Sequence, residues 1–352
     1  MRNGFIFLSL LLLAGCATHT DDPNASSELL PDPTYSKWLD IRGLGRPDDD
    51  GGVKGVFRTA EKVGTPAWTI AQWASKLSLA DPAITQQTQL DKSRFQIANR
   101  SKRVVVDCRR GEIDLGLFAS ACYDHPRQKN EAWPHLLVQT ALTDTRYPSR
   151  TCHVADIKRL EVAMSCRLDS FVDRHPDADP KLHAAQFQLF LYVQNLQQGD
   201  DGFGDMLWFG VPIFDNRYPV KEESYQRDGG KADASGKFIY SLPGKACIAE
   251  GQGFVKNGCL LAGKDARWVD IHVDVAPWIA YAYKLARKNG YLATTDFQDL
   301  YVSGLNFGWE MPGTYDSVMQ VRGFSLTATP TSAQPASLEA RAARPLTALP
   351  NR

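Results

Sequence analysis

Ten segments between residues 102 and 328 have the residue pattern of β-strands, and short turn segments separate most of them. Apolar and polar residues alternate in many of these segments, which is the period of an extended chain with one buried face. Helices do not alternate with the strands, so a parallel α/β fold is disfavoured. We therefore expect a mainly β protein, a two-sheet antiparallel sandwich of the jelly-roll kind with one or two short helices.

The expected strands are 102–108, 112–119, 133–142, 157–168, 183–196, 206–214, 237–242, 268–275, 301–309 and 317–328.

Two segments have helical spacing instead. Thr65 and Pro66 form a cap followed by proline at the first helical position, and apolar residues recur at helical spacing up to Asp81. The second segment is clearer, because Asp274 precedes a run of helical spacing that Gly290 ends. We expect a short helix in each place.

The first fifteen residues have the pattern of an export signal, with Arg2 ahead of the apolar run 5–13. This run is too short to span about 30 Å of hydrocarbon as a helix. The four residues that end in Cys16 read Leu-Ala-Gly-Cys and resemble the lipobox of bacterial lipoproteins, which implies a lipid on Cys16 and a membrane anchor. Ala17 differs from the aspartate that retains such proteins at the inner membrane, so we expect a lipid-anchored protein of the bacterial cell envelope, at the outer membrane. The alternative is an ordinary secretory signal with a cysteine there by chance.

Composition divides the remaining chain into three parts. Residues 16–60 are rich in Asp, Pro, Gly and Ser and suggest a flexible tether, with Tyr35 and Trp38 as possible docking points. Residues 61–328 form the expected β-sandwich domain with an N-terminal helical segment. Residues 329–352 have little to bury and should be disordered.

The net charge of the chain bears on its binding partners, and its cysteine content bears on disulfides. Without residues 1–15 the chain has 39 basic and 40 acidic residues, a net charge of −1, so we expect no nucleic-acid partner.

Six cysteines follow Cys16, and an even number in an exported chain favours disulfides. Closeness along the chain and hairpin geometry predict Cys108 with Cys122, Cys152 with Cys166, and Cys247 with Cys259. Metal binding is the weaker interpretation, because no pair of cysteines has the C-x-x-C spacing.

One strand carries a pattern suited to sugars. In residues 183–194, alternate positions form an apolar face, while Gln186, Gln188, Phe190, Tyr192 and Gln194 form a polar and aromatic face. Amides hydrogen-bond sugar hydroxyls, and aromatic rings stack on the C–H faces of sugars. The alternative is an ordinary solvated outer face.

Similar mixtures elsewhere supply the candidate residues, because the chain has no G-x-S-x-G, H-E-x-x-H, P-loop or dinucleotide motif. General acid–base and carboxylate chemistry suggests catalytic roles for His135, Tyr192, Arg217, His272 and Glu310. Stacking and amide contacts suggest ligand-binding roles for Trp133, Gln186, Gln188, Trp208, Asn306 and Trp309. Core packing explains many tryptophans equally well, and Asp274, another candidate acid, has an alternative role as a helix cap.

We expect no cofactor. The acidic loop 199–202 with Asp205 makes calcium the one possibility, although it lacks the spacing of an EF-hand.

The segments 133–137, 207–212 and 307–316 look like parts of large exported jelly-roll proteins that bind or process carbohydrates. The resemblance covers about residues 95–328 and is architectural, so it transfers no catalytic residue. It implies a polysaccharide or oligosaccharide partner, bound only or cleaved by a polysaccharide lyase or a glycoside hydrolase. The competing hypothesis is a non-enzymatic envelope protein that binds a protein partner through an exposed apolar patch.

Overall fold

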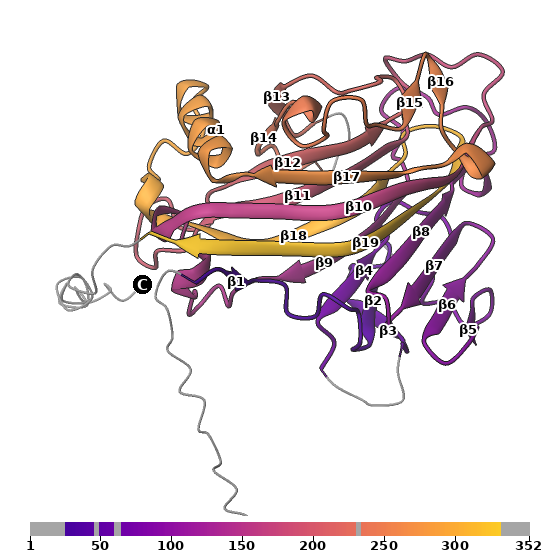
Figure 1. Cartoon of the computed structure of the whole chain (residues 1–352), viewed down its shortest axis with the longest axis horizontal. Coiled ribbons are helices and arrows are strands. Elements are labelled where there is room, and N and C mark those ends of the chain that lie inside the picture. Colours follow the sequence, from indigo (N-terminus) through magenta and orange to yellow (C-terminus); the bar gives the residue numbers. More distant parts are fainter. Residues whose placement is uncertain (1–24, 46–48, 60–64, 230–233, 332–352) are drawn as a thin grey trace, which may run out of the picture.

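The computed structural model describes residues 25–45, 49–59, 65–229 and 234–331, and in these ranges two large sheets pack face to face (Figure 1). Cys16, the signal segment and nearly all of the tail lie outside the described residues. The fold is therefore mainly β and a two-sheet sandwich, as predicted. No helix in the described ranges is long and apolar enough to cross a membrane.

Sheet A has eight strands in the described part of the chain, with β1 beside β19 at one end of the ladder. Its strands, in spatial order, are β17 (Trp268–Asp274), β10 (Ile157–Asp173), β19 (Tyr315–Pro330), β8 (Glu112–Phe118), β7 (Lys102–Asp107), β6 (Arg94–Ala98) and β5 (Gln86–Gln89), with β1 (Ser27–Glu28) off this path.

Sheet B has nine strands among the same residues, antiparallel except for the pairs β12–β14 and β2–β4. Its order is β13 (Ser224–Arg227), β14 (Phe238–Ser241), β12 (Met206–Asp215), β11 (Gln186–Asn195), β18 (Leu300–Glu310), β9 (His135–Ala141), β4 (Trp68–Ala71), β2 (Leu39–Arg42) and β3 (Val53–Phe57). A small hairpin joins β15 (Val255–Lys256) to β16 (Cys259–Leu260). Six 3₁₀ turns complete the described part: η1 (Ala119–Ala121), η2 (Arg150–Cys152), η3 (Val154–Asp156), η4 (Gly244–Ala246), η5 (Gly263–Asp265) and η6 (Phe297–Asp299).

The core lies between the sheets and contains many aromatic side chains. Trp309 on β18 is 0% exposed, and its indole N–H donates a 2.8 Å hydrogen bond to the carbonyl of Leu115 in the opposite sheet. Trp68 packs edge-on against Phe307, with ring centroids 6.0 Å apart. Because side chains alternate along a strand, this inward set fixes which residues each sheet presents outward.

The ten predicted strands are all confirmed, with ends that differ by a few residues. The predicted second helix is also confirmed as α1 (Ala276–Lys288), which lies beside one end of the sheets (Figure 1). The carboxylate of Asp274 accepts hydrogen bonds from the N–H groups of Ala276 (3.1 Å) and Leu160 (3.0 Å). Val275 is the N-cap residue, but Asp274 accepts from the first N–H group of α1 and so has a structural role at the helix start, and it also ties α1 to β10.

The predicted helix over 65–81 is wrong, because Trp68–Ala71 forms strand β4. Its backbone pairs with β2 on one side and β9 on the other, and Trp68 and Ile70 are both buried in the core. These tertiary contacts override the local helical spacing.

The predicted flexible tether over 16–60 is also wrong for its described part. Strands β2 and β3 come from this segment and complete one side of sheet B, while Tyr35 is 0% exposed and packs 5.4 Å from Trp68. Acidic and glycine-rich turns surround these short strands, which explains why composition hides them.

The predicted disulfides are absent, since all six cysteines of the described residues are free thiols. The spacing of 14 residues reflects a strand and its flanking turns, not a hairpin: β8 lies between Cys108 and Cys122, and the part of β10 between Ile157 and Cys166 extends about 30 Å. In the third couple, Cys259 is exposed on a hairpin whereas Cys247 is buried.

We predict that a thiol-reactive probe at about pH 8 labels Cys259 first in the folded protein. Burial raises the pKa of Cys108 to about 11 and that of Cys247 to about 12, and it also raises the pKa of Cys166, so these thiols hold little reactive thiolate. Peptide mapping should find the remaining sites labelled only after denaturation without reductant. Fewer than six labelled sites in the denatured chain downstream of Cys16 would show that disulfides do form.

Candidate functional site

The outer face of sheet B brings together most of the predicted site residues. Register places Asp215, Gln186, Glu310 and His135 side by side on β12, β11, β18 and β9. Further along the same strands, Phe190 lies beside Asn306, and Tyr192 lies beside Trp208. These residues lie on the side of sheet B away from the core, because their neighbours in sequence form the core, but His135, Asp215 and Asn306 are themselves only 3–4% exposed. We call this surface the sheet-B face.

Aromatic rings cover the middle of the sheet-B face. The Tyr192 and Trp208 rings meet edge to face at 4.9 Å, and Phe190 meets Trp208 at 6.0 Å. Glycines lie beneath two of these rings: a Cβ on Gly304 would come within 3.0 Å of the Tyr192 ring, and one on Gly210 within 2.8 Å of Phe190. The missing side chains let the rings lie against the neighbouring strands.

Two polar groups in this aromatic region have bonding capacity left for a ligand. The Asn306 amide donates a 2.9 Å hydrogen bond to the Tyr192 hydroxyl, but its Oδ1 is buried and accepts no hydrogen bond within the described chain. Burial raises the pKa of Tyr192, so its hydroxyl keeps its proton. Since that oxygen already accepts from Asn306, its O–H is placed to donate to a ligand.

Glu310 and His135 form an acid–base pair at one end of the sheet-B face. His135 Nε2 lies 3.8 Å from a carboxylate oxygen of Glu310, and Nδ1 lies 3.2 Å from the carbonyl of Trp73. This carbonyl requires Nδ1 to donate, which directs the other ring nitrogen toward Glu310. The ring stacks on Trp133 with centroids 6.0 Å apart, so its orientation is held from two sides.

Asp215 is the other carboxylate of this row, and Arg217 engages both of its oxygens. Arg217 Nε and Nη2 donate to it at 2.8 and 2.7 Å, and the Gln186 amide donates at 2.9 Å. Burial raises the pKa of Asp215, but these hydrogen bonds outweigh it and leave the pKa below its usual value. Burial also lowers the pKa of nearby Lys221, against the effect of the Asp215 and Glu310 carboxylates.

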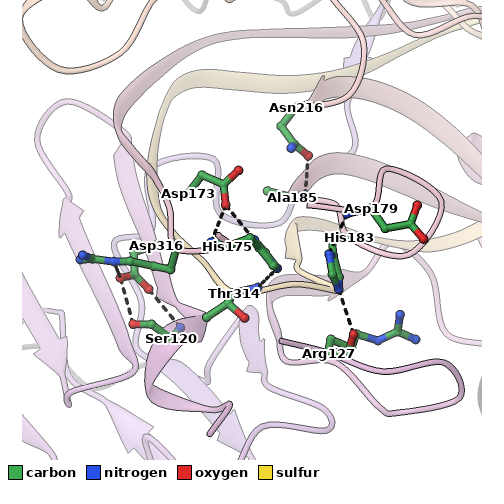
Figure 2. Close-up of polar contacts among 11 residues, drawn as sticks. Ser120, Arg127, Asp173, His175, Asp179, His183, Ala185, Asn216, Thr314 and Asp316 are labelled. Atoms are coloured by element: carbon green, nitrogen blue, oxygen red, sulfur yellow. Dashed lines mark hydrogen bonds and ion pairs between the residues drawn. The ribbon is translucent and has the colours of Figure 1, made fainter. Parts of the chain in front are cut away.

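A polar cluster around the buried rings of His175 and His183 fixes the loops behind this end of the face (Figure 2). His175 and His183 stack with centroids 4.3 Å apart. His175 bonds the Asp173 carboxylate at 2.7 Å and accepts from the Thr314 N–H at 2.9 Å, which ties the end of β10 to the turn after Glu310. His183 Nε2 donates to the carbonyl of Arg127 at 2.9 Å. The Arg127 guanidinium in turn lies 4.8 Å from the centroid of the Trp133 ring.

Two predicted site residues lie elsewhere. His272 is on the outer face of sheet A, 3.4 Å from Glu161, because β17 joins sheet A and not sheet B. Trp309 is in the core, because it is adjacent to the outward Glu310 and must point inward. Neither residue can reach a ligand on the sheet-B face.

The predicted catalytic groupings are only partly assembled. A lyase would need His135, Tyr192 and Arg217 in one cleft. Tyr192 lies six residues along β11 from the row that contains His135, about 20 Å at strand spacing, so these three residues do not form one lyase site. Asp215 is two strands from Glu310, about 10 Å, which is near the upper limit for an inverting glycosidase pair. Both oxygens of Asp215 already accept hydrogen bonds from Arg217, so Asp215 is a supporting residue.

Two acidic side chains of the predicted calcium loop accept hydrogen bonds from other parts of the protein. Asp200 accepts a 2.7 Å hydrogen bond from Asn195, and Asp205 accepts one of 3.1 Å from Thr295. No group of three or more His, Cys, Asp or Glu residues in the described ranges is arranged to hold a metal ion.

Sequence reasoning missed Lys221 and Trp73 as parts of the acidic end. Lys221 follows β12 by several residues and approaches Glu310 only through the path of its loop. Trp73 follows β4, a segment whose local spacing predicts a helix. Trp73 contacts His135 because β4 pairs with β9. No local pattern signals either position.

We predict that Asp215→Asn destabilises the fold, because it leaves Arg217 without its anionic partner. The loss at neutral pH should be on the order of 3 kcal/mol. The folded pKa of Asp215 is lowered, so its stabilisation is complete above the unfolded value of about 3.9 and is lost as pH falls toward the folded value. Urea unfolding at several pH values should therefore show the two proteins converging in acid. A constant difference down to the lowest pH would contradict this role.

Comparisons with known proteins find sandwich enzymes at low similarity. No family model and no curated protein matches the chain. Similar solved structures include the endoglucanase Cel12A from Rhodothermus marinus, at 9% identity over 70% of this chain and 100% of that one, with a TM-score of 0.35. The family 12 xyloglucanase from Bacillus licheniformis has 10% identity over 69% and 99%, with a TM-score of 0.37. The family 11 xylanase from Neocallimastix patriciarum has 9% identity over 70% and 96%, with a TM-score of 0.33. At these scores the likeness has no bearing on what this chain does.

Proposed function

We propose that the protein binds a polysaccharide chain along the sheet-B face. The observation that carries this proposal is the aromatic and amide surface of Tyr192, Trp208 and Asn306, where a buried carbonyl oxygen has no partner among the described residues. A buried amide oxygen without a hydrogen bond costs about 1–3 kcal/mol. Because this oxygen has almost no accessible surface, a ligand hydroxyl would have to displace a neighbouring side chain to bind it and remove this cost.

Sugar chains match the rest of this surface. A sugar has C–H faces that pack on rings and hydroxyls that both donate and accept hydrogen bonds. Gln186, Tyr192 and Trp208 are half-buried residues, so each presents part of its surface on this face. The face also extends about 20 Å from Trp208 to Glu310, which suits a polymer better than a single sugar.

Hydrolysis of the bound chain is a second candidate function, and the Glu310–His135 contact of 3.8 Å favours it. A protonated Glu310 could donate its proton to the glycosidic oxygen as the bond from that oxygen to the sugar carbon breaks. Water would add to the sugar carbon, and the proton it releases would return to the carboxylate. His135 would exchange a proton with Glu310, and Lys221 would add positive charge near both groups.

We also propose that the protein acts at the bacterial envelope, attached through lipid on Cys16. The short apolar segment and the residues before Cys16 support this proposal. The protein-binding alternative stays a prediction. The exposed large apolar side chains come from many segments, such as Val53, Tyr147, Phe203 and Tyr281, and they favour no particular partner.

We predict that Trp208→Ala lowers the affinity for a neutral polysaccharide by about tenfold or more, because the aromatic platform contributes at least 1.4 kcal/mol. The measurement is affinity electrophoresis of the mature chain carrying Cys16→Ser against soluble β-glucans and xylans. Tyr281→Ala, which removes an exposed ring from α1, is the control and should bind as the parent protein does. Equal binding by the Trp208 variant, or no binding to any glycan, would reject the proposed face.

We predict that Glu310→Gln lowers the rate of any glycan cleavage by about 100-fold or more, while affinity changes little. Glu161→Gln is the matched control, because Glu161 also lies beside a histidine but on sheet A. New reducing ends report hydrolysis, and the ultraviolet absorbance of an unsaturated uronate reports a lyase. A parent protein that binds glycans without producing either signal would be a binding protein only.

A further inference from the structure

A groove of about 900 Å³ lies on the outer face of sheet A, on the opposite side of the sandwich from the sheet-B face. Register aligns Trp268, Arg167, Gln320, Asp114 and Val105 across β17, β10, β19, β8 and β7. Five adjacent strands span about 19 Å from the first to the last. The groove is therefore long enough for several units of a polymer.

Basic residues outnumber acidic ones in this groove. The basic residues that line it are Lys92, Arg94, Arg109, Arg110, Arg167 and Arg322. The acidic residues are Asp91, Asp107, Glu112 and Asp114. The difference gives the groove a formal charge of +2, whereas the whole chain is neutral.

Several guanidinium groups in the groove have donors left for a ligand. Arg322 lies 3.9 Å from the centroid of the Trp268 ring and donates no hydrogen bond within the described residues. Arg167 donates to Asp169 at 3.2 Å, but its Nε is buried and has no partner there. Arg110 is 71% exposed and lies 3.9 Å from Asp107, so this long contact leaves most of its guanidinium open to solvent.

We propose that this groove binds an acidic polysaccharide, with sugar carboxylates on Arg322 and Arg167 and sugar hydroxyls on the acidic and amide groups between them. Guanidinium groups bind carboxylates through paired N–H donors. The Gln320 amide already donates to Asp114 at 3.3 Å, so this row keeps carboxylate and carbonyl oxygens that accept from hydroxyls.

The interspersed acids favour a uronate chain over a phosphate-rich surface. A uronate polymer presents one carboxylate for each acidic sugar and several hydroxyls beside it. A membrane surface or single-stranded DNA presents phosphates with few hydroxyl donors beside them, so Asp107, Glu112 and Asp114 would repel these charges without gaining hydrogen bonds in return. The groove therefore matches a ligand that alternates acceptors and donors.

The test uses the mature chain carrying Cys16→Ser and measures binding to polygalacturonate at low salt and at about 0.15 M salt. The double variant Arg167→Gln, Arg322→Gln should bind at least about tenfold more weakly. Lys284→Gln, which removes an exposed charge from α1, is the control and should bind as the parent does. If the double variant has a lowered melting temperature, the single variant Arg322→Lys keeps the charge but loses the paired donors, and it should still bind several-fold more weakly.

Two further arms separate this site from the sheet-B face and from phosphate binding. Trp208→Ala should leave polygalacturonate binding unchanged, and the arginine variant should leave neutral glycan binding unchanged, so either site can fail without the other. Vesicles with anionic phospholipid and single-stranded DNA should bind more weakly than polygalacturonate. Tighter binding of either phosphate probe, no binding of polygalacturonate, or equal binding by the arginine variant would overturn the proposal.

Discussion

The contact between the two sheets is the constraint on which the rest of this structure depends. Trp309 is fixed inward by its bond to the Leu115 carbonyl of the opposite sheet. Because side chains alternate along a strand, this single orientation sends Glu310 and Asn306 to the outer surface of β18. The same alternation on β11 sends Tyr192 outward while its neighbours enter the core. The proposed ligand surface is thus a consequence of how the core packs.

The two ends of the sheet-B face differ in their electrostatics. Around Tyr192 and Trp208 the surface is mainly aromatic, with Arg42 as the nearby charge, which suits recognition by packing and hydrogen bonds. Around Glu310 it collects an imidazole, an ammonium group and the Asp215–Arg217 pair, which suits proton transfer. Binding and chemistry would therefore take place at opposite ends of the sheet-B face, and one bound polymer would reach both ends.

Local sequence pattern predicted the long strands and one helix, because period-two alternation and caps act within a few residues. It failed where the structure depends on contacts between distant segments. Strand β4 exists because β2 and β9 pair with it, and the cysteines stay apart because strands hold them at opposite ends. For the site, alternation placed Gln186 and Tyr192 on one face of their strand, but it could not tell that Asn306 lies beside them or that β17 belongs to the other sheet. His272 was misplaced for that reason.

The place of β2 and β3 in sheet B determines how this chain can be shortened. A version that begins at residue 61 would lose both strands and also Tyr35, which covers Trp68. Strand β4 would then become the edge of the sheet, with one row of backbone groups open to solvent and an apolar core beside it. Such an edge pairs readily with other chains, so the shortened protein would aggregate. The stretch whose composition suggests a flexible tether therefore forms the edge that closes this side of sheet B.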